Sequence, residues 1–163
     1  SGVAVIALAG AAAAQTTVVN ITGATAFRAA ANTSIIALLG GSGTTEYAFD
    51  TTTGATAGAT NRAIYRGTVA GISGTVIVRA SWSGSTAGIA AVAAGTPVQV
   101  LKTTTTMTTA GNGFAAVAGD FETAPAAFAF SDVAQAASTT RRKSTPAVAW
   151  SVSASATVSL SGT

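Results

Sequence analysis

The sequence contains no cysteine and no histidine among its 163 residues. Without cysteine the chain has no disulfide framework and no thiol chemistry. Without histidine it lacks the usual general base and the most common metal ligand in proteins. A serine–lysine hydrolase pair would need Lys102 or Lys143, and neither lies in a recognisable motif. The sequence therefore predicts a protein that is not an enzyme and that uses no cofactor and no metal.

Charged residues are also scarce. They make up 8% of the chain, against roughly a quarter in an ordinary soluble domain, and Ala, Thr, Ser and Gly take their place. This composition favours an exported, surface or filament protein. The formal net charge is only +3, and the one basic cluster, residues 141–143, is interpreted as a solvated loop. We therefore expect no nucleic-acid partner, which would require clustered Lys and Arg.

The first 15 residues, "SGVAVIALAGAAAAQ", carry no charge at all. They resemble the apolar region of a secretory signal followed by a small-residue cleavage site, and predict a periplasmic, secreted or cell-surface protein. The alternative is that they form a buried first strand or helix of the domain. The run is too short to span a membrane, which takes about 20 apolar residues.

β-branched runs alternate with segments of helical periodicity along residues 16–143. This alternation predicts one α/β lobe with a mainly parallel sheet and short helices. The pattern predicts loops at residues 42–61 and 108–125. The expected strands lie at residues 16–22, two within 62–82, one beginning near 97, and 126–130; the expected helices lie at residues 26–39, 86–94 and 133–138.

The C-terminal segment, residues 144–163, has a different pattern. From Val148 to Leu160 every even position is apolar, and all but one of the odd positions are Ser or Thr. A period of two is typical of a half-buried strand. The segment is therefore predicted to be a β-rich tail, as one long strand or a hairpin.

Small or hydroxyl residues follow three of the expected strands, at residues 23–25, 83–86 and 131–132. In an α/β sheet such strand ends meet at the carboxyl edge, where ligands usually bind. A helix start presents unpaired N–H groups and a partial positive charge, so three converging starts can hold a tetrahedral oxyanion. The alternative is ordinary helix capping, which prefers the same residue types and is favoured by spacing alone.

Asp132 bears on the choice between an oxyanion site and ordinary helix capping. A carboxylate only accepts hydrogen bonds, so beside a bound anion it would favour an oxyanion that still carries a proton over one that is fully ionised. The alternative is that Asp132 caps the last expected helix.

The stretches "ITGATAFRAAANTSI", "SWSGSTAGIAAVAAGT" and "FAFSDV" occur in the order found in phosphate-binding proteins of ABC transporters. The chain resembles the N-terminal lobe of this family, which has the type 2 periplasmic-binding fold. The resemblance implies phosphate or a similar oxyanion as ligand, held by backbone N–H groups, hydroxyls and one Asp, and a membrane transporter as partner. The turns and the resemblance together give these candidate ligand-binding residues: Thr25, Ala26, Phe27, Ser83, Ser85, Thr86, Ser131 and Asp132.

The sequence departs from the family pattern in three ways. The turn "GATAF" has one residue more than the family's "GATF", and a long segment, residues 97–130, separates "GIAAVAAGT" from "SDV". The family also has a second lobe that closes over the ligand, so the chain is expected to be a fragment or a reduced relative. The competing interpretation is a structural surface, fibre or phage-like assembly protein without a small-molecule ligand, whose alternating tail pairs with a neighbouring subunit.

Overall fold

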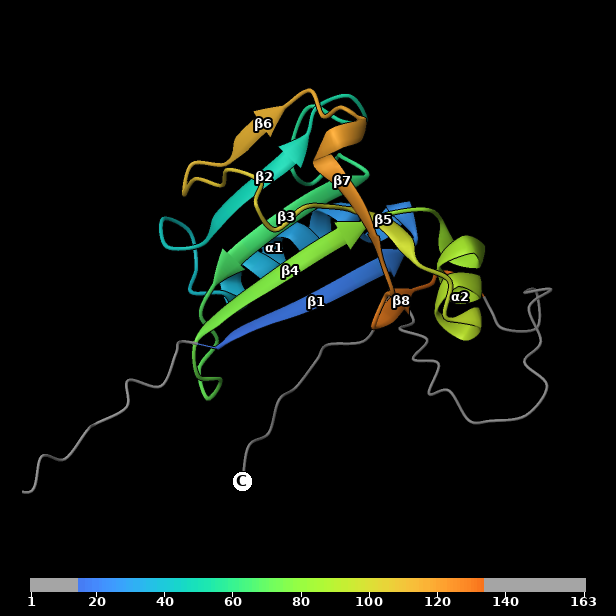
Figure 1. Ribbon diagram of the computed structural model, residues 1–163, viewed down its shortest axis with the longest axis horizontal. Coiled ribbons are helices and arrows are strands. Elements are labelled where there is room, and N and C mark those ends of the chain that lie inside the picture. Colours follow the sequence, from blue (N-terminus) through green and yellow to red (C-terminus); the bar gives the residue numbers. More distant parts are fainter. Residues whose placement is uncertain (1–14, 134–163) are drawn as a thin grey trace, which may run out of the picture.

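A six-stranded sheet forms the centre of the computed structural model, which describes residues 15–133 (Figure 1). The strands are β1 (Thr16–Gly23), β2 (Glu46–Asp50), β3 (Arg62–Gly67), β4 (Thr75–Ser81), β5 (Val98–Leu101), β6 (Asn112–Phe114), β7 (Phe121–Ala124) and β8 (Phe128–Phe130). The helices are α1 (Arg28–Leu38) and α2 (Ser85–Ala94), with 3-10 turns η1 (Thr25–Phe27) and η2 (Ala118–Asp120). The main sheet has the order β6-β2-β3-β4-β1-β8, and β5 and β7 form a separate antiparallel pair.

The predicted α/β fold with short helices is confirmed, but the sheet is mixed. β1 runs parallel to β4 and β8, and β2 runs parallel to β6. β3 is antiparallel to both of its neighbours, β2 and β4. Only a short turn through Gly71 and Gly74, both with positive φ, joins β3 to β4. A connection this short allows only an antiparallel pair, because a parallel pair needs a crossover of a dozen or more residues.

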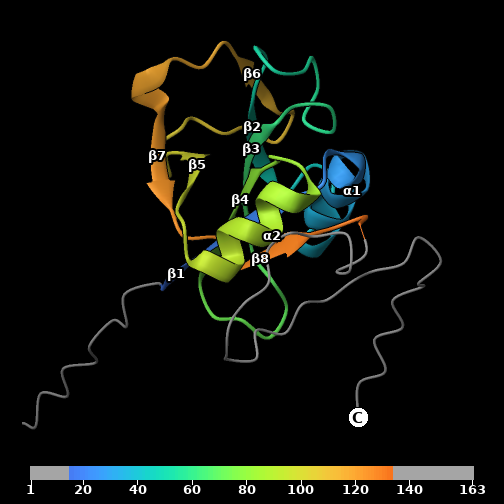
Figure 2. The ribbon, with the colours of Figure 1, turned by 90° about the vertical axis from the view of Figure 1, so that its right-hand side faces the viewer.

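The two faces of the sheet are covered differently. Figure 2 places α1 on one side of the strands and the β5–β7 pair on the other. On the α1 side the buried core consists of Ile21, Ala31, Ile35, Leu39, Ala63, Tyr65, Val76, Val78, Ala80 and Trp82. On the β5–β7 side it consists of Ala48, Ile64, Ile77, Leu101 and Met107. β4 is buried on both faces because it lies between these two cores, which suits its Val- and Ile-rich sequence.

The structure corrects the two predicted loops. Residues 42–61 contain β2, whose Ala48 is fully buried. Residues 108–125 contain β6, η2 and β7. These strands have only three to five residues each, so their conformation depends on the strand alongside more than on local propensity.

Several predictions concern residues outside the described part of the chain. The proposed signal segment, residues 1–15, lies outside it except for Gln15, whose carbonyl accepts the Thr75 N–H at 2.9 Å. The third expected helix continues beyond Val133, and the alternating tail begins at residue 144. Within residues 15–133, the helices that form are too short or too polar to cross a membrane.

Tyr65 on β3 predicts how stability depends on alkaline pH. Burial raises the pKa of its hydroxyl well above the usual value of about 10, and the nearby Tyr47 adds to the rise. Above about pH 10 the unfolded chain loses this proton while the folded chain keeps it, so the free energy of unfolding falls by about 1.4 kcal/mol per pH unit. Denaturant titrations of the wild type and Tyr65→Phe across this range test the effect. In Tyr65→Phe the free energy of unfolding should fall with pH less steeply than in the wild type, by about 1.4 kcal/mol per pH unit. The substitution also removes the hydrogen bond from the Tyr65 hydroxyl to Asn32 Oδ1 (3.1 Å). Equal slopes would contradict the prediction.

Candidate functional site

The carboxyl ends of β1, β4 and β8 meet at one edge of the sheet, where α2 begins (Figure 2). Two main-chain hydrogen bonds tie the three turns together. Gly84 N–H donates to the Gly23 carbonyl at 2.9 Å, and Ala24 N–H donates to the Phe130 carbonyl at 2.8 Å. The strands expected at residues 16–22 and 126–130, and the second of the two expected within residues 62–82, are neighbouring strands of one sheet, with β1 in the middle.

Two glycines allow the turns to approach this closely. Gly23 has a φ of +123°, and a Cβ atom there would lie 2.0 Å from the Phe130 carbonyl oxygen. A Cβ atom on Gly88 in α2 would lie 2.5 Å from the Gly23 Cα atom. The first turn of α2 therefore packs directly on the end of β1. Gly23 was visible in the sequence as part of a turn, whereas Gly88 carried no signal beyond being a small residue in a helix.

Ser85 and Asp132, both predicted site residues, form a pair across the second and third turns. The Ser85 hydroxyl donates to the Asp132 carboxylate. In return, Asp132 N–H donates to Ser85 Oγ at 3.5 Å. Asp132 is exposed and Ser85 is half-buried, so the pair lies at the surface, where a solute can reach it.

The hydroxyls of Ser131 and Ser83 make hydrogen-bond contacts within the protein. Ser131 Oγ accepts the Val133 N–H at 3.2 Å, which is a local turn contact. Ser83 is exposed, and its Oγ lies 3.2 Å from Thr22 Oγ1. Thr22 is fully buried and donates to the Ser81 carbonyl at 2.6 Å, so it fixes the end of β4. Nothing in the sequence distinguishes Thr22, since a threonine in a strand is ordinary.

The first turn contributes backbone groups. Thr25 and Ala26 are exposed at the start of η1. Phe27 N–H donates to the Ala24 carbonyl at 3.1 Å, and the Phe27 ring packs 5.8 Å from the Phe130 ring. Phe27 is thus engaged in the fold, whereas Thr25 and Ala26 are accessible to solvent.

No side chain caps η1, α1 or α2. The N-cap of η1 is Ala24, and the N-cap of α2 is Gly84 with a φ of +95°. Thr86, in the first turn of α2, is exposed. The capping alternative thus fails at the first two turns. At the third turn the helix that Asp132 would cap lies outside the described residues.

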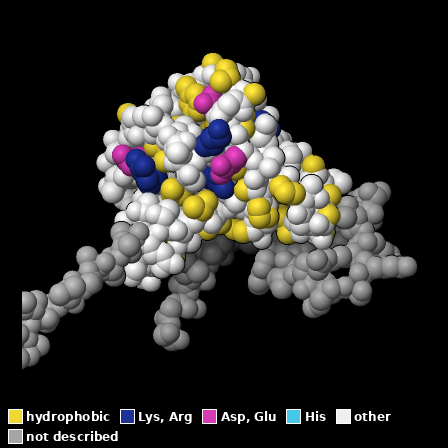
Figure 3. Space-filling model, viewed as in Figure 1, with side chains coloured by type: hydrophobic (Ala, Val, Ile, Leu, Met, Phe, Trp, Pro, Cys, Tyr) yellow, Lys and Arg dark blue, Asp and Glu magenta, His cyan; other side chains and the backbone are white. Residues whose placement is uncertain are grey.

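One cation lies beside the first turn. Arg28 Nε donates to the Thr25 carbonyl at 3.0 Å, and Arg28 Nη1 donates to Asn61 Oδ1 at 2.7 Å. No motif in the sequence distinguishes this arginine. α2 itself has no charged residue, and Figure 3 shows a surface of apolar and uncharged side chains over it, with the charges gathered over the strands.

A separate polar cavity of about 390 Å³ lies away from these turns, between the loop after β5, the strand β6 and the 3-10 turn η2. Its lining contains none of the predicted site residues; it consists of Lys102, Thr104, Thr105, Thr106, Asn112, Phe114, Gly119 and Asp120. Within residues 15–133, no three acidic side chains cluster closely enough to hold a metal ion.

Comparison of the chain with known proteins finds no matching family model, no matching curated protein and no matching solved structure. The geometry of the three turns is therefore the basis on which a function is proposed.

Proposed function

We propose that the chain is a solute-binding domain that captures a protonated tetrahedral oxyanion, with phosphate as the leading case. The observation that carries this proposal is the convergence of two helix starts without side-chain caps beside the Ser85–Asp132 pair. Helix starts of this kind attract anions through their N–H groups and their partial positive charge. The guanidinium of Arg28 adds a fixed positive charge beside the first turn.

The Ser85–Asp132 pair supplies selectivity in this proposal. An arriving phosphate accepts the Ser85 hydroxyl proton as a hydrogen bond and donates its own proton to the Asp132 carboxylate. Both partners of the pair then keep a hydrogen bond. A fully ionised anion such as sulfate has no proton to donate, so its oxygens face an acceptor-only carboxylate. The proposed activity is binding and not catalysis.

The wider setting follows from the sequence and is part of the same proposal. The domain is exported to the periplasm or the cell surface, and it delivers its solute to a membrane transporter. It corresponds to one lobe of a two-lobed binding protein of the phosphate type. The long segment before "SDV" is a departure from the family pattern, but it is compatible with three neighbouring turns, because it forms β5, β6 and β7 and then brings β8 to the side of β1.

Asp132→Asn tests the selectivity. The substitution replaces an acceptor with a group that can also donate. A hydrogen bond to a charged group contributes about 1.5–3 kcal/mol, so the phosphate affinity should fall roughly tenfold to a hundredfold. Sulfate affinity should stay unchanged or rise. Calorimetric titrations with millimolar phosphate and sulfate, run in parallel on both proteins, measure the ratio.

Asp120→Asn is the matched control, since it removes the same charge at a carboxylate that instead accepts from Val117 N–H at 2.8 Å before β7. Its phosphate-to-sulfate ratio should equal that of the wild type. The proposal fails if the wild type binds no phosphate at these concentrations, or if Asp132→Asn leaves the ratio unchanged.

A second candidate function is assembly into a fibre or surface layer. It is favoured by the outer edge of β1 at Thr16–Val19, which has no strand partner within residues 15–133. An exposed edge of this kind can pair with another chain. Light scattering after size-exclusion chromatography separates the two functions, because a binding domain stays monomeric and an assembly protein forms larger species as concentration rises.

A further inference from the structure

β1 is paired along its whole length on one side only. On the β4 side the pairing runs from Thr16 to Thr22. On the other side β8 pairs only with Ile21–Gly23. Within residues 15–133, the outer edge of Thr16–Val19 therefore presents main-chain groups with no strand beside them, which is a template for an additional strand.

The chain path before β8 leaves this space open. Ala127 N–H donates to the Asn20 carbonyl at 2.8 Å, which begins the contact between β8 and β1. Asn20 Nδ2 donates to the Pro125 carbonyl at 3.0 Å. Upstream of Pro125 the chain turns away into β7, which lies over the face of the sheet (Figure 1). β8 therefore does not extend alongside Thr16–Val19.

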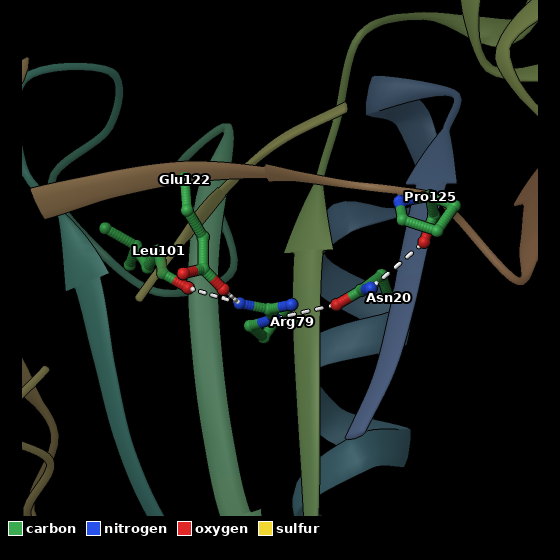
Figure 4. A network of polar contacts seen from close by, with 5 residues as sticks. All are labelled: Asn20, Arg79, Leu101, Glu122 and Pro125. Carbon is green, nitrogen blue, oxygen red and sulfur yellow. Dashed lines mark hydrogen bonds and ion pairs between the residues drawn. The ribbon is translucent and has the colours of Figure 1, made fainter. Parts of the chain in front are cut away.

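The two faces of this open edge differ in chemistry. On the α1 side lie Val19, whose register partner Val78 belongs to the core, and Phe128, which is 43% exposed and in register with Ile21. On the opposite side lie Val18, which is 39% exposed, and Asn20, which belongs to a polar network with Arg79 (Figure 4). A strand that fits here needs an apolar face on the α1 side, and small polar side chains suit the mixed opposite side.

Residues 148–160 have this pattern, with apolar residues at every even position and Ser or Thr at nearly every odd one. The described chain ends at Val133, three residues after β8. The linker from there to Val148 can span up to about 50 Å when extended. β1 is only about 26 Å long at 3.3 Å per residue, so the linker is long enough to bring the segment alongside it.

We propose that residues 148–160 of the same chain add a strand to the outer edge of β1 at Thr16–Val19. Their apolar side chains cover Val19 and Phe128, and their Ser and Thr side chains lie on the side of Val18 and Asn20. This addition removes the open edge that would otherwise pair with a second copy. It is independent of the oxyanion proposal.

Cysteine pairs test the register directly, because the natural sequence contains no cysteine. Val18→Cys is combined in turn with Ser151→Cys, Ser153→Cys, Ser155→Cys or Thr157→Cys, and with Ala154→Cys as the even-position control. Directly opposite residues in paired strands have Cβ atoms about 4.5–5.5 Å apart, close to disulfide geometry. We expect at least one odd position to form an intramolecular disulfide about tenfold faster than position 154, with the preference abolished in denaturant.

Equal rates at odd and even positions would overturn the proposal, and so would disulfides found only in dimers, which would assign the edge to a second copy. Hydrogen exchange gives a second measurement on the full chain. Val152→Asp should raise the amide exchange rates of Thr16–Val19, whereas Ser153→Asp should not. The proposal would also be overturned if neither substitution changed the amide exchange rates of Thr16–Val19.

Discussion

Gly23→Ala is expected to lower the free energy of unfolding by about 2–5 kcal/mol. A residue with a side chain at positive φ costs roughly 1–2 kcal/mol, and forcing extra atoms into a packed region costs about 1–3 kcal/mol more. Both apply here, because Gly23 has a φ of +123° and the new Cβ would lie 2.0 Å from the Phe130 carbonyl oxygen. A loss of this size is a large fraction of the stability of a typical domain. Urea denaturation followed by tryptophan fluorescence measures it, since Trp82 packs against the Phe130 ring.

Gly71→Ala separates the two causes. Gly71 has a φ of +82°, but nothing lies within 4 Å of its Cβ position. This variant should lose only the conformational cost of about 1–2 kcal/mol. If Gly23→Ala and Gly71→Ala were equally stable, the contact between β1 and β8 would not be tight, and the convergence of the three turns would lose its physical basis.

Arg79→Ala is expected to lower the free energy of unfolding by about 2–4 kcal/mol. Arg79 is 5% exposed on β4, and it donates to Asn20 Oδ1 at 2.7 Å, to the Leu101 carbonyl at 3.4 Å and to the Glu122 carboxylate (Figure 4). Each buried acceptor that loses its donor costs about 1–3 kcal/mol. The Glu122 side chain is 44% exposed, so water replaces part of that contact and the ion pair itself contributes less.

Arg66→Ala is the matched control for this substitution. Arg66 pairs with Glu46 at 2.7 Å, but both side chains are more than a third exposed. An exposed pair contributes about 0–1 kcal/mol, so this variant should unfold close to the wild type. Arg79→Ala should also increase amide exchange in β5 and β7, because its guanidinium holds both strands on the sheet. A loss of stability without that local change would assign Arg79 to general packing.

The main strands of the site could be predicted from the sequence. β1, β4 and β8 are runs of β-branched or aromatic residues, each followed by small or hydroxyl residues, and strand ends of this type meet at one edge of a parallel arrangement. The same pattern located Ser85 and Asp132, which the structure brings into contact. Hydrophobic periodicity also placed α1 to within a few residues, because Ala31 and Ile35 bury one of its faces. The expected helix at residues 86–94 is α2, although Gly88 is its only buried residue.

Other features depended on contacts that no local pattern records. β6 is a strand because three residues pair with Ala48–Asp50 of β2, which lies more than 60 positions earlier. Thr22, Gly88 and Arg79 look ordinary in the sequence, and their roles come from atoms that other elements bring near them.

The sequence by itself thus determined which segments become the central strands and helices, and which small residues follow them, because local periodicity and propensity act within a few residues. The tertiary structure decided that η1 and α2 begin without side-chain caps, that the sheet is mixed and that β8 pairs with only the last three residues of β1. Each of these depends on which distant backbone groups pair with one another, and that pairing is fixed only when the whole sheet forms.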